Sequence, residues 1–236
     1  MVVGFAISGF AGDAACCATR EMAATTATSK ARMSHDYTRD REAPIHEYDL
    51  IADWYAQDRP GSDAGRPEVV SLAASLPPGA RVLDIGCGTG MPVTRALADA
   101  GLRVVGLDSS ARMIRHFRQT LPHTPIARAS IVFCPFVDSA FDAAVAWGVL
   151  FHLPHHTQRR AFSEVGRVLR PGAPFLFTAG DIDDAHSDVM NDVTFPYYSF
   201  TTETYRLELA VHGLELIDTH RDRGQNIYYL ARKLTA

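Results

Sequence analysis

The fold of this chain is decided by the stretch Val82-Leu83-Asp84-Ile85-Gly86-Cys87-Gly88-Thr89-Gly90. It begins with a short apolar run, which predicts a buried strand, and three glycines within five residues follow at once. Glycine lacks a Cβ, so a strand can turn there directly into a helix while the backbone approaches a ligand. The N-terminus of that helix presents backbone N–H groups as a polar edge. The stretch therefore predicts a strand, a ligand-binding turn and a helix.

Apolar runs and helical patterns alternate on both sides of this turn. Strands are predicted at 81–85, 102–107, 124–129, 141–147 and 174–178, and helices between them at 91–100, 110–121 and 157–169. This alternation indicates βαβ units, with a parallel sheet covered by helices on both faces. A further helix is expected at 202–211, and strands at 214–220 and 226–233 form a hairpin. We therefore predict an α/β fold, a Rossmann-like doubly wound seven-stranded sheet that is mostly parallel with an antiparallel C-terminal hairpin strand.

Two acidic residues flank the turn, Asp84 before it and Asp108 at the end of the next predicted strand. In a doubly wound sheet, a carboxylate at the position of Asp108 faces a bound ribose. The dinucleotide fingerprint Gly-x-Gly-x-x-Gly is not met, because Met91 stands three residues after Gly88. Asp84 would repel a pyrophosphate, whereas it suits a ligand with an ammonium group. S-Adenosylmethionine (SAM) carries an ammonium, a sulfonium, a ribose and no phosphate, so the charges favour SAM.

These residues resemble the motifs of the class I SAM-dependent methyltransferases, in particular the small-molecule enzymes of methyltransferase types 11 and 25. The glycine turn resembles the first motif, and residues 105–114 look like the second. Residues 136–145 resemble the approach to the fourth strand, and residues 169–172 the turn before the fifth. Residues 48–55 are similar to the N-terminal helix of many small-molecule members. The resemblance extends over roughly residues 47–233.

The resemblance implies a cofactor site at the turn and at the ends of the following strands. Its residues would be Asp84, Gly86, Gly88, Gly90, Asp108, Ser109, Ser110, Met113, Ser130, Ile131 and Trp147. Asp84 and the glycines would line the methionine half of SAM, and Asp108 would hold the ribose. The family usually carries an acidic residue that contacts adenine after the third strand. This chain has Ser130 and Ile131 there, so the backbone amide of Ile131 is expected to make that contact.

Methyl transfer is an in-line displacement in which alignment and desolvation supply much of the rate, so it needs a base only when the acceptor loses a proton. His152 is the candidate base, because it follows the fourth predicted strand, where ligands of open α/β sheets bind. Packing at a strand–helix junction is the alternative role. His155 and His156 are expected at a helix start. No Cys or carboxylate accompanies these histidines, so we expect no metal site.

Acceptor-binding residues are expected in the N-terminal helix and in segment 180–200. Aromatic faces attract a cationic centre, although packing on the sheet is an equally good role for Tyr48 and Trp147 and the better one for Tyr55. Segment 180–200 shows no regular period, so we expect a loop that serves as a substrate lid. Its aromatic cluster favours a planar or apolar acceptor. The candidate substrate residues are Tyr48, Trp147, Tyr197 and Tyr198.

Composition limits the classes of partner. The 236 residues are 47% hydrophobic and 21% charged, with a net charge of −4. No basic block provides a footprint for nucleic acid, and no apolar run is long enough to span a membrane. The spacing of Cys16, Cys17, Cys87 and Cys134 fits neither a disulfide framework nor a zinc site. We therefore expect a soluble cytoplasmic protein, a monomer or homodimer, with a small-molecule substrate and no nucleic acid.

The predicted organisation is one domain after an atypical start. Residues 1–32, rich in Ala and Thr, are expected to be a disordered extension before the true start at Met33, with a cleaved targeting segment as the alternative. The domain would span residues 33–236: N-terminal helices at 45–76, a Rossmann-like core at 80–179, the lid at 180–200, and a C-terminal helix and hairpin at 201–233.

The expected function is transfer of a methyl group from SAM to an O, N or C nucleophile of a small molecule. Three alternatives remain. They are a methyltransferase that acts on RNA or protein, a non-catalytic SAM-binding protein, and a nicotinamide-dependent dehydrogenase, which the glycine spacing and Asp84 disfavour.

Overall fold

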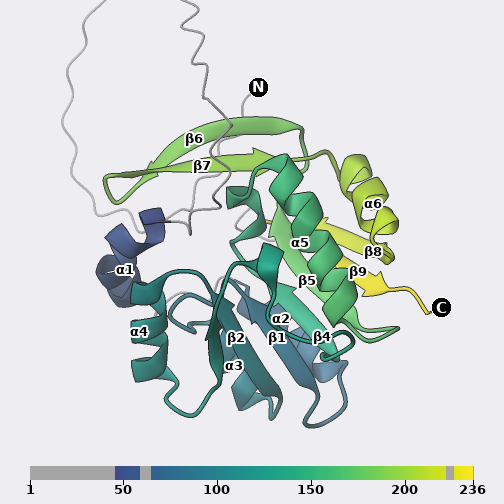
Figure 1. Cartoon of the computed structure of the whole chain (residues 1–236), viewed down its shortest axis with the longest axis horizontal. Coiled ribbons are helices and arrows are strands. Elements are labelled where there is room, and N and C mark those ends of the chain that lie inside the picture. The colour runs from purple at the N-terminus through teal and green to yellow at the C-terminus, as the bar shows by residue number, and fades with distance from the viewer. Residues whose placement is uncertain (1–45, 59–64, 222–225, 236) are drawn as a thin grey trace, which may run out of the picture. The chain divides into compact units, whose positions relative to one another are not determined.

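The centre of the fold is a seven-stranded sheet with the order β3-β2-β1-β4-β5-β9-β8 (Figure 1). The computed structural model describes residues 46–58, 65–221 and 226–235. The expectations for residues 1–32, with Cys16 and Cys17, and for a start at Met33 concern residues outside these ranges. The strands are β1 (Arg81–Ile85), β2 (Arg103–Asp108), β3 (Ile126–Arg128), β4 (Ala143–Ala146), β5 (Pro174–Ala179), β8 (Leu214–Arg221) and β9 (Ile227–Lys233). Neighbours from β3 to β5 pair in parallel, whereas β9 is antiparallel to both β5 and β8. The predicted sheet is confirmed.

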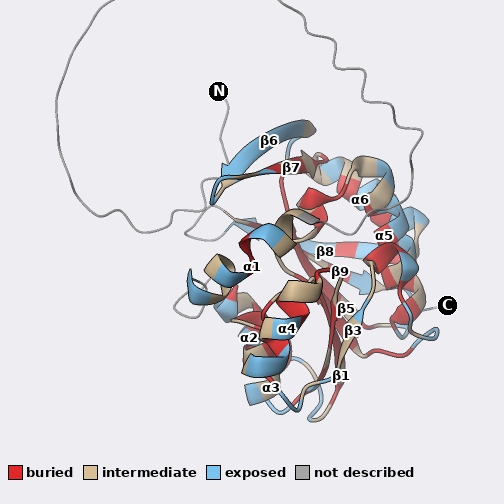
Figure 2. Ribbon diagram, turned by 60° about the vertical axis from the view of Figure 1, so that its left-hand side comes forward, coloured by how far each residue is buried: buried red, intermediate tan, exposed pale blue. Residues whose placement is uncertain are grey.

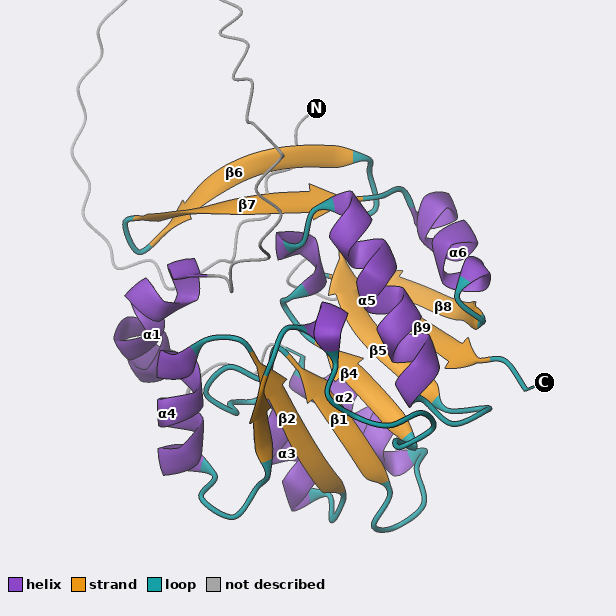
Figure 3. Cartoon of the chain, viewed as in Figure 1, coloured by secondary structure: helices purple, strands orange, loops and turns teal. Residues whose placement is uncertain are grey.

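Helices cover both faces of this sheet (Figure 3). On one face, α2 (Arg66–Ala74) and α3 (Val93–Asp99) bury their apolar side chains against β1, β2 and β4. On the other face, α5 (His155–Val168) and α6 (Thr202–Val211) pack on β4, β5 and β9. Successive residues of β4 alternate between the two cores, because neighbouring side chains of a strand point to opposite faces. Figure 2 shows the resulting buried strands between partly exposed helices.

The strand order reverses between β1 and β4. The chain adds β2 and β3 on one side of β1, and then returns to add β4 and β5 on the other. In open α/β sheets, ligands bind beyond the carboxyl ends of the strands at such a reversal. The glycine turn after β1, the helix α4 (Ala111–Thr120) after β2 and the 3₁₀-helix η3 (Leu150–His152) after β4 all begin at this edge.

Two elements lie outside the layers, beyond the carboxyl ends of the parallel strands (Figure 1). They are α1 (His46–Asp58) and a separate two-stranded sheet, formed by β6 (Asp184–Met190) and β7 (Val193–Ser199). Helix α1 contacts both α4 and β7, and β7 also contacts η3. The two elements therefore form a roof over the edge of the sheet where a ligand is expected.

The expectation of an irregular loop at 180–200 is wrong, because most of this segment is the β6–β7 hairpin. Its turn consists of Asn191 and Asp192, both with positive φ, as a type I′ hairpin turn requires. Two features hide the strands from a periodicity argument. Almost every side chain of β6 is exposed, and Pro196 interrupts the apolar run of β7. The Asn-Asp pair was the available signal.

Several predicted boundaries shift by a few residues. Helix α3 is shorter than the predicted 91–100, and α5 begins at His155 rather than at 157. Between β3 and β4 the chain forms only the short 3₁₀-helix η2 (Ile131–Phe133). Across the described ranges, no helix is both long and apolar enough to cross a membrane.

Candidate active site

The glycine turn has different neighbours at each glycine. A Cβ on Gly86 would lie 2.7 Å from Cβ of Val149, and one on Gly90 would lie 2.6 Å from Cδ1 of Leu121. Around Gly88, the only heavy atom that such a Cβ would approach within 4 Å belongs to Tyr55, at 3.9 Å, among the residues that the structure describes. Close packing of the protein therefore explains Gly86 and Gly90. Gly88 is the position where the backbone is open to a ligand.

Replacing Gly90 with Ala is expected to lower the free energy of unfolding by about 3 kcal/mol, since left-handed strain and overpacking each cost about 1–2 kcal/mol or more. Gly90 has φ +84, and its new methyl group would meet the buried Leu121 and Phe117 of the α4 region. Chemical denaturation measures the loss. Gly101→Ala is the matched control, because Gly101 has φ +79, and its new Cβ would meet no atom within 4 Å among the described residues other than its chain neighbours. Equal losses in the two variants would refute the packing argument.

Asp108 ties the end of β2 to the glycine turn. Its Oδ2 accepts a hydrogen bond from the backbone N–H of Gly88, and its Oδ1 accepts one from the N–H of Ser110, both at 2.8 Å. Burial raises the pKa of Asp108, and these backbone hydrogen bonds oppose the rise. The predicted ribose-binding carboxylate is therefore held in place by the two loops that it joins.

Asp84 is a buried carboxylate, 1% exposed, beneath the same turn. Thr94 of α3 donates a hydrogen bond to its Oδ2 at 2.5 Å. Burial raises the pKa of Asp84 to about 7 against this hydrogen bond, and the charge of Asp108 adds to the rise. Within the described residues, no cationic side chain is among the groups that shift this pKa. Such a carboxylate suits a ligand that brings its own positive charge.

The residues predicted near ribose and adenine lie at the start of α4 and of η2. Ser110 is the N-cap of α4: its Oγ accepts a hydrogen bond from the N–H of Met113 and donates one to Asp49. Ser109 precedes it, and the Met113 side chain is buried. Ser130 precedes η2, and the Ile131 side chain is in the core. Contacts of these residues with a cofactor stay predictions.

Trp147 follows β4 on the face covered by α2 and α3. Its ring packs on Tyr228 of β9, with 4.7 Å between ring centroids, and lies against Gly65 at the start of α2. These contacts account for an aromatic residue at this position without any ligand. A contact of Trp147 with the cofactor or the acceptor stays a prediction.

His152 of η3 contacts both Tyr48 of α1 and Pro196 of β7. It is 4% exposed, and its Nδ1 lies 3.0 Å from the carbonyl oxygen of Pro196, which can only accept a hydrogen bond. The proton of the neutral ring is therefore on Nδ1, and Nε2 accepts a hydrogen bond from the Tyr48 hydroxyl at 2.9 Å. Burial lowers the pKa of His152 to about 4, so the ring is neutral near pH 7.

The inner face of the hairpin is aromatic. Phe195 and Tyr197 of β7 form one buried cluster with Ile51 of α1, and Tyr48 of α1 and Phe151 of η3 pack against this cluster. The Tyr197 ring stacks on Phe151, with centroids 5.6 Å apart, and on His186 at 5.3 Å. Strand alternation places Tyr198 on the opposite face of β7 from Tyr197. The structure therefore brings together Tyr48, His152 and Tyr197, and separates Tyr198 from them.

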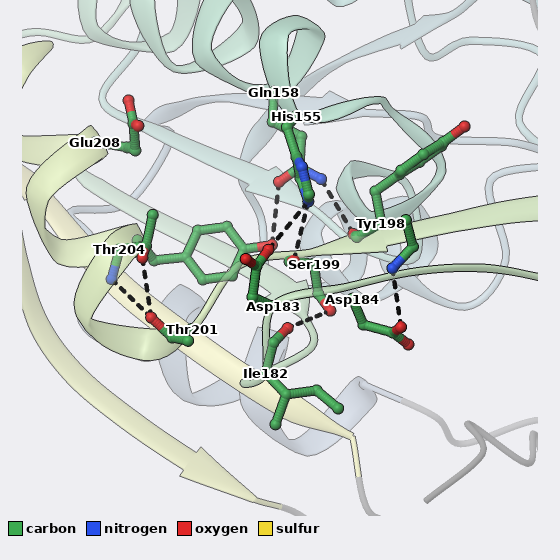
Figure 4. A network of polar contacts seen from close by, with 12 residues as sticks. His155, Gln158, Ile182, Asp183, Asp184, Tyr198, Ser199, Thr201, Thr204 and Glu208 are labelled. Atoms are coloured by element: carbon green, nitrogen blue, oxygen red, sulfur yellow. Dashed lines mark hydrogen bonds and ion pairs between the residues drawn. The ribbon is translucent and has the colours of Figure 1, made fainter. Parts of the chain in front are cut away.

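Helix α5 anchors the base of this hairpin (Figure 4). Gln158 donates a hydrogen bond from Nε2 to the carbonyl of Tyr198 at 3.1 Å, and His155 donates one from Nε2 to the carbonyl of Ser199 at 3.0 Å. Ser199 in turn donates from Oγ to the carbonyl of Ile182 at 2.7 Å, which joins the two ends of the hairpin. The strand that carries Tyr197 is thereby fixed to the main domain.

A surface groove lies away from this site, and the described ranges contain no group of three or more His, Cys, Asp or Glu that is arranged to hold a metal ion. The groove lies between α2, the turn at 170–174 and β8, at the amino ends of β4 and β5. It is at the opposite edge of the sheet from the glycine turn.

Four residues that sequence reasoning missed belong to the site: Asp49, Thr94, Phe151 and Phe195. Asp49 stands beside Tyr48 in residues 48–55, which resemble the N-terminal helix of the family, but nothing in its spacing predicts a contact with α4. Thr94 lies in the helix after the turn, and no pattern marks its hydroxyl as the partner of Asp84. Phe151 and Phe195 are aromatic neighbours of His152 and Tyr197, and their orientation depends on strand and turn geometry.

Comparison with known proteins identifies the class. The sequence model of a family described as a methyltransferase domain matches residues 82–172. Sterol methyltransferase-like 3 of Botryococcus braunii is 31% identical over 172 residues, which cover 62% of this chain and 43% of that protein. Demethylmenaquinone methyltransferase of Renibacterium salmoninarum is 36% identical over 105 residues, which cover 44% of this chain and 43% of that protein. The chain thus spans less than half the length of these two relatives.

A solved structure shares the fold. It is the 1,6-didemethyltoxoflavin-N1-methyltransferase of Burkholderia thailandensis, with bound 1,6-didemethyltoxoflavin and S-adenosylhomocysteine (SAH). Its TM-score is 0.62 at 20% identity, over 82% of this chain and 92% of that chain. Residues 82–172 of this chain therefore form a methyltransferase domain, and the whole fold is that of a solved SAM-dependent methyltransferase. The class predicted from the sequence is confirmed.

Proposed function

We propose that this chain transfers a methyl group from SAM to a small-molecule acceptor. The observation that carries the proposal is the aromatic roof over the glycine turn, which the chain builds from its own α1 and β6–β7 hairpin. Its inner face carries apolar and aromatic side chains, and some of their rings stack on one another. Binding sites for planar or apolar small molecules are lined mainly by such side chains. The names of similar proteins refer to sterol, demethylmenaquinone and 1,6-didemethyltoxoflavin substrates, which supports an acceptor of this size.

The residues at the turn fit SAM. When bound, SAM supplies an electrophilic methyl group on a sulfonium. Asp84 would face the ammonium group, because it is a buried carboxylate with no described cation to pair with. Asp108 would accept hydrogen bonds from the ribose hydroxyls while it keeps those from Gly88 and Ser110. Gly88 would allow the backbone to approach the ligand.

His152 acts through Tyr48 in this proposal. The Nε2 atom of His152 already accepts a hydrogen bond from the Tyr48 hydroxyl, and the ring is almost fully buried. An acceptor group would therefore meet the phenol oxygen first. As the acceptor gives a proton to that oxygen, the phenol can pass its own proton to Nε2. The Pro196 carbonyl holds Nδ1–H throughout and keeps the ring in the required tautomer.

The test is transfer of labelled methyl from SAM into a cell extract, with products separated by size. Label in the small-metabolite fraction, absent with the Asp108→Ala protein, is the expected result and supplies the acceptor for identification. Label in RNA or protein would replace the small-molecule proposal with a macromolecular one. SAH binding without any transfer would identify a non-catalytic SAM-binding protein.

The affinity for SAH, which carries the same ammonium group, is expected to fall about tenfold between pH 7.5 and pH 6. The pKa of Asp84 is raised to about 7 in the folded protein, whereas that of an unfolded Asp is about 3.9. Between these two pH values, Asp84 is therefore protonated in the folded state and ionised in the unfolded state. This group's contribution to stability therefore decreases as the pH rises from about 4 to 7, and the ligand favours the ionised form that results. Calorimetry in buffers of different ionisation enthalpy would detect the released proton.

Asp84→Asn is the control for this pH dependence. Its amide cannot ionise, so the variant is expected to bind SAH more weakly and with an affinity that does not change over the same range. A slope that persists in Asp84→Asn would assign the titration to another group, such as Asp108, whose pKa is also raised by burial.

A further inference from the structure

Two adjacent residues of α1 reach opposite halves of the site. Tyr48 donates its hydroxyl proton to His152 on the acceptor side. Asp49 instead accepts two hydrogen bonds through Oδ1, one from the Ser110 hydroxyl at 2.5 Å and one from the backbone N–H of Arg112 at 3.0 Å. A carboxylate is a strong acceptor for the exposed N–H groups at a helix start, and here it comes from a different helix.

The contact of Asp49 continues to the predicted ribose site. The backbone N–H of Ser110 donates to Oδ1 of Asp108, and the N–H of Gly88 donates to Oδ2. A continuous set of hydrogen bonds therefore runs from α1 through Ser110 and Asp108 to the glycine turn. On the same helix, Cε1 of Tyr55 lies 3.9 Å from the position that a Cβ on Gly88 would take, so α1 borders the open side of the turn. The position of α1 is thus linked to the atoms that would contact the cofactor.

We propose that Asp49 is a positioning residue that couples the docking of α1 to the cofactor loop, by which we mean the glycine turn at 86–90 together with residues 108–110. This inference rests on the proposed function. Bound cofactor fixes Asp108 and the start of α4, and this favours the docked helix. The docked helix brings Tyr48 to His152 and completes the acceptor side of the site. Cofactor binding thereby prepares the acceptor side, and the coupling acts equally in both directions.

Asp53 provides a matched comparison. It is also on α1 and also contacts α4, through an ion pair with Arg112 and a hydrogen bond with His116 at 2.8 Å. Its side chain is 61% exposed, and neither contact reaches Ser110 or Asp108. Exposed ion pairs add little to stability. Both residues are therefore on α1 and contact α4, but only Asp49 is linked by hydrogen bonds to the cofactor loop.

The experiment measures SAH binding by calorimetry and amide hydrogen exchange of α1 with and without SAH, in the full chain. Asp49→Ala is expected to bind SAH about tenfold more weakly, which is within the usual range of coupling between sites. In the wild-type protein, SAH is expected to slow exchange in residues 46–58, and this protection should be absent in Asp49→Ala. Asp53→Ala should bind within about twofold of wild type and keep the protection.

Asp49→Asn separates the hydrogen bonds from the charge. The Asn oxygen can accept the same two hydrogen bonds, and its neutral amide removes the charge that helps to raise the pKa of Asp108. The affinity of this variant for SAH is therefore expected to be close to that of wild type or higher. Equal losses in Asp49→Ala and Asp53→Ala, or no loss in Asp49→Ala, would overturn the proposal. A wild-type protein that fails to bind SAH would instead overturn the proposed function.

Discussion

Asp108→Asn is expected to weaken SAH binding about 100-fold, because hydrogen bonds to a charged acceptor contribute about 1.5–3 kcal/mol each and two ribose hydroxyls lose that acceptor. The native carboxylate uses one oxygen for the N–H of Gly88 and the other for the N–H of Ser110. In the amide, one of these oxygens becomes an NH₂ group, which faces a backbone donor. The substitution therefore also disturbs the turn that holds the ligand.

Calorimetric titration with SAH measures this effect, and Asp142→Asn is the matched control. Asp142 likewise accepts a hydrogen bond from a backbone N–H, that of Arg81 at 2.8 Å, and it pairs with Arg170. It stands at the opposite edge of the sheet, before β4. Binding within about twofold of wild type is expected for this control. If Asp108→Asn bound SAH as tightly as wild type, the ribose assignment would be wrong.

Tyr48→Phe and His152→Phe are each expected to lower kcat about 100-fold for an acceptor that loses a proton, the lower end of what a positioned base contributes. The two residues act as one unit in the proposal, since the phenol hydroxyl donates to Nε2. The double variant should therefore be no slower than either single variant. Groups that work through each other give such non-additive effects, whereas independent residues multiply theirs.

The kinetic measurement uses the acceptor identified by methyl labelling, and SAH affinity serves as the control. Both phenylalanine variants keep a ring beside Phe195, and the ring at 152 also stays beside Tyr197, so SAH affinity should change little. A large loss in His152→Phe with full activity in Tyr48→Phe would mean that His152 contacts the acceptor directly. Full activity in both would assign the pair to packing alone.

Sequence patterns predicted the central fold because each signal there is local. Apolar runs followed by helical periods indicate parallel strands and crossover helices, and this pattern gave the sheet from β1 to β5. The β6–β7 hairpin was missed because β6 is exposed on nearly all of its length and so has no apolar period. Hydrophobic periodicity cannot predict a strand such as β6, because its turn and its pairing with β7 fix it in place, and only β7 has a buried face.

Within the candidate site, the sequence alone determined the glycine turn and the positions of Asp84 and Asp108, because these residues lie at strand ends where chain direction fixes them. Only the tertiary structure decided what the remaining residues contact. Tyr48 and His152 are 104 residues apart and Asp49 and Ser110 are 61 apart, yet each pair shares a hydrogen bond. Such pairs form through the docking of α1 on α4 and β7, and no local pattern encodes a contact between two separate helices and a hairpin.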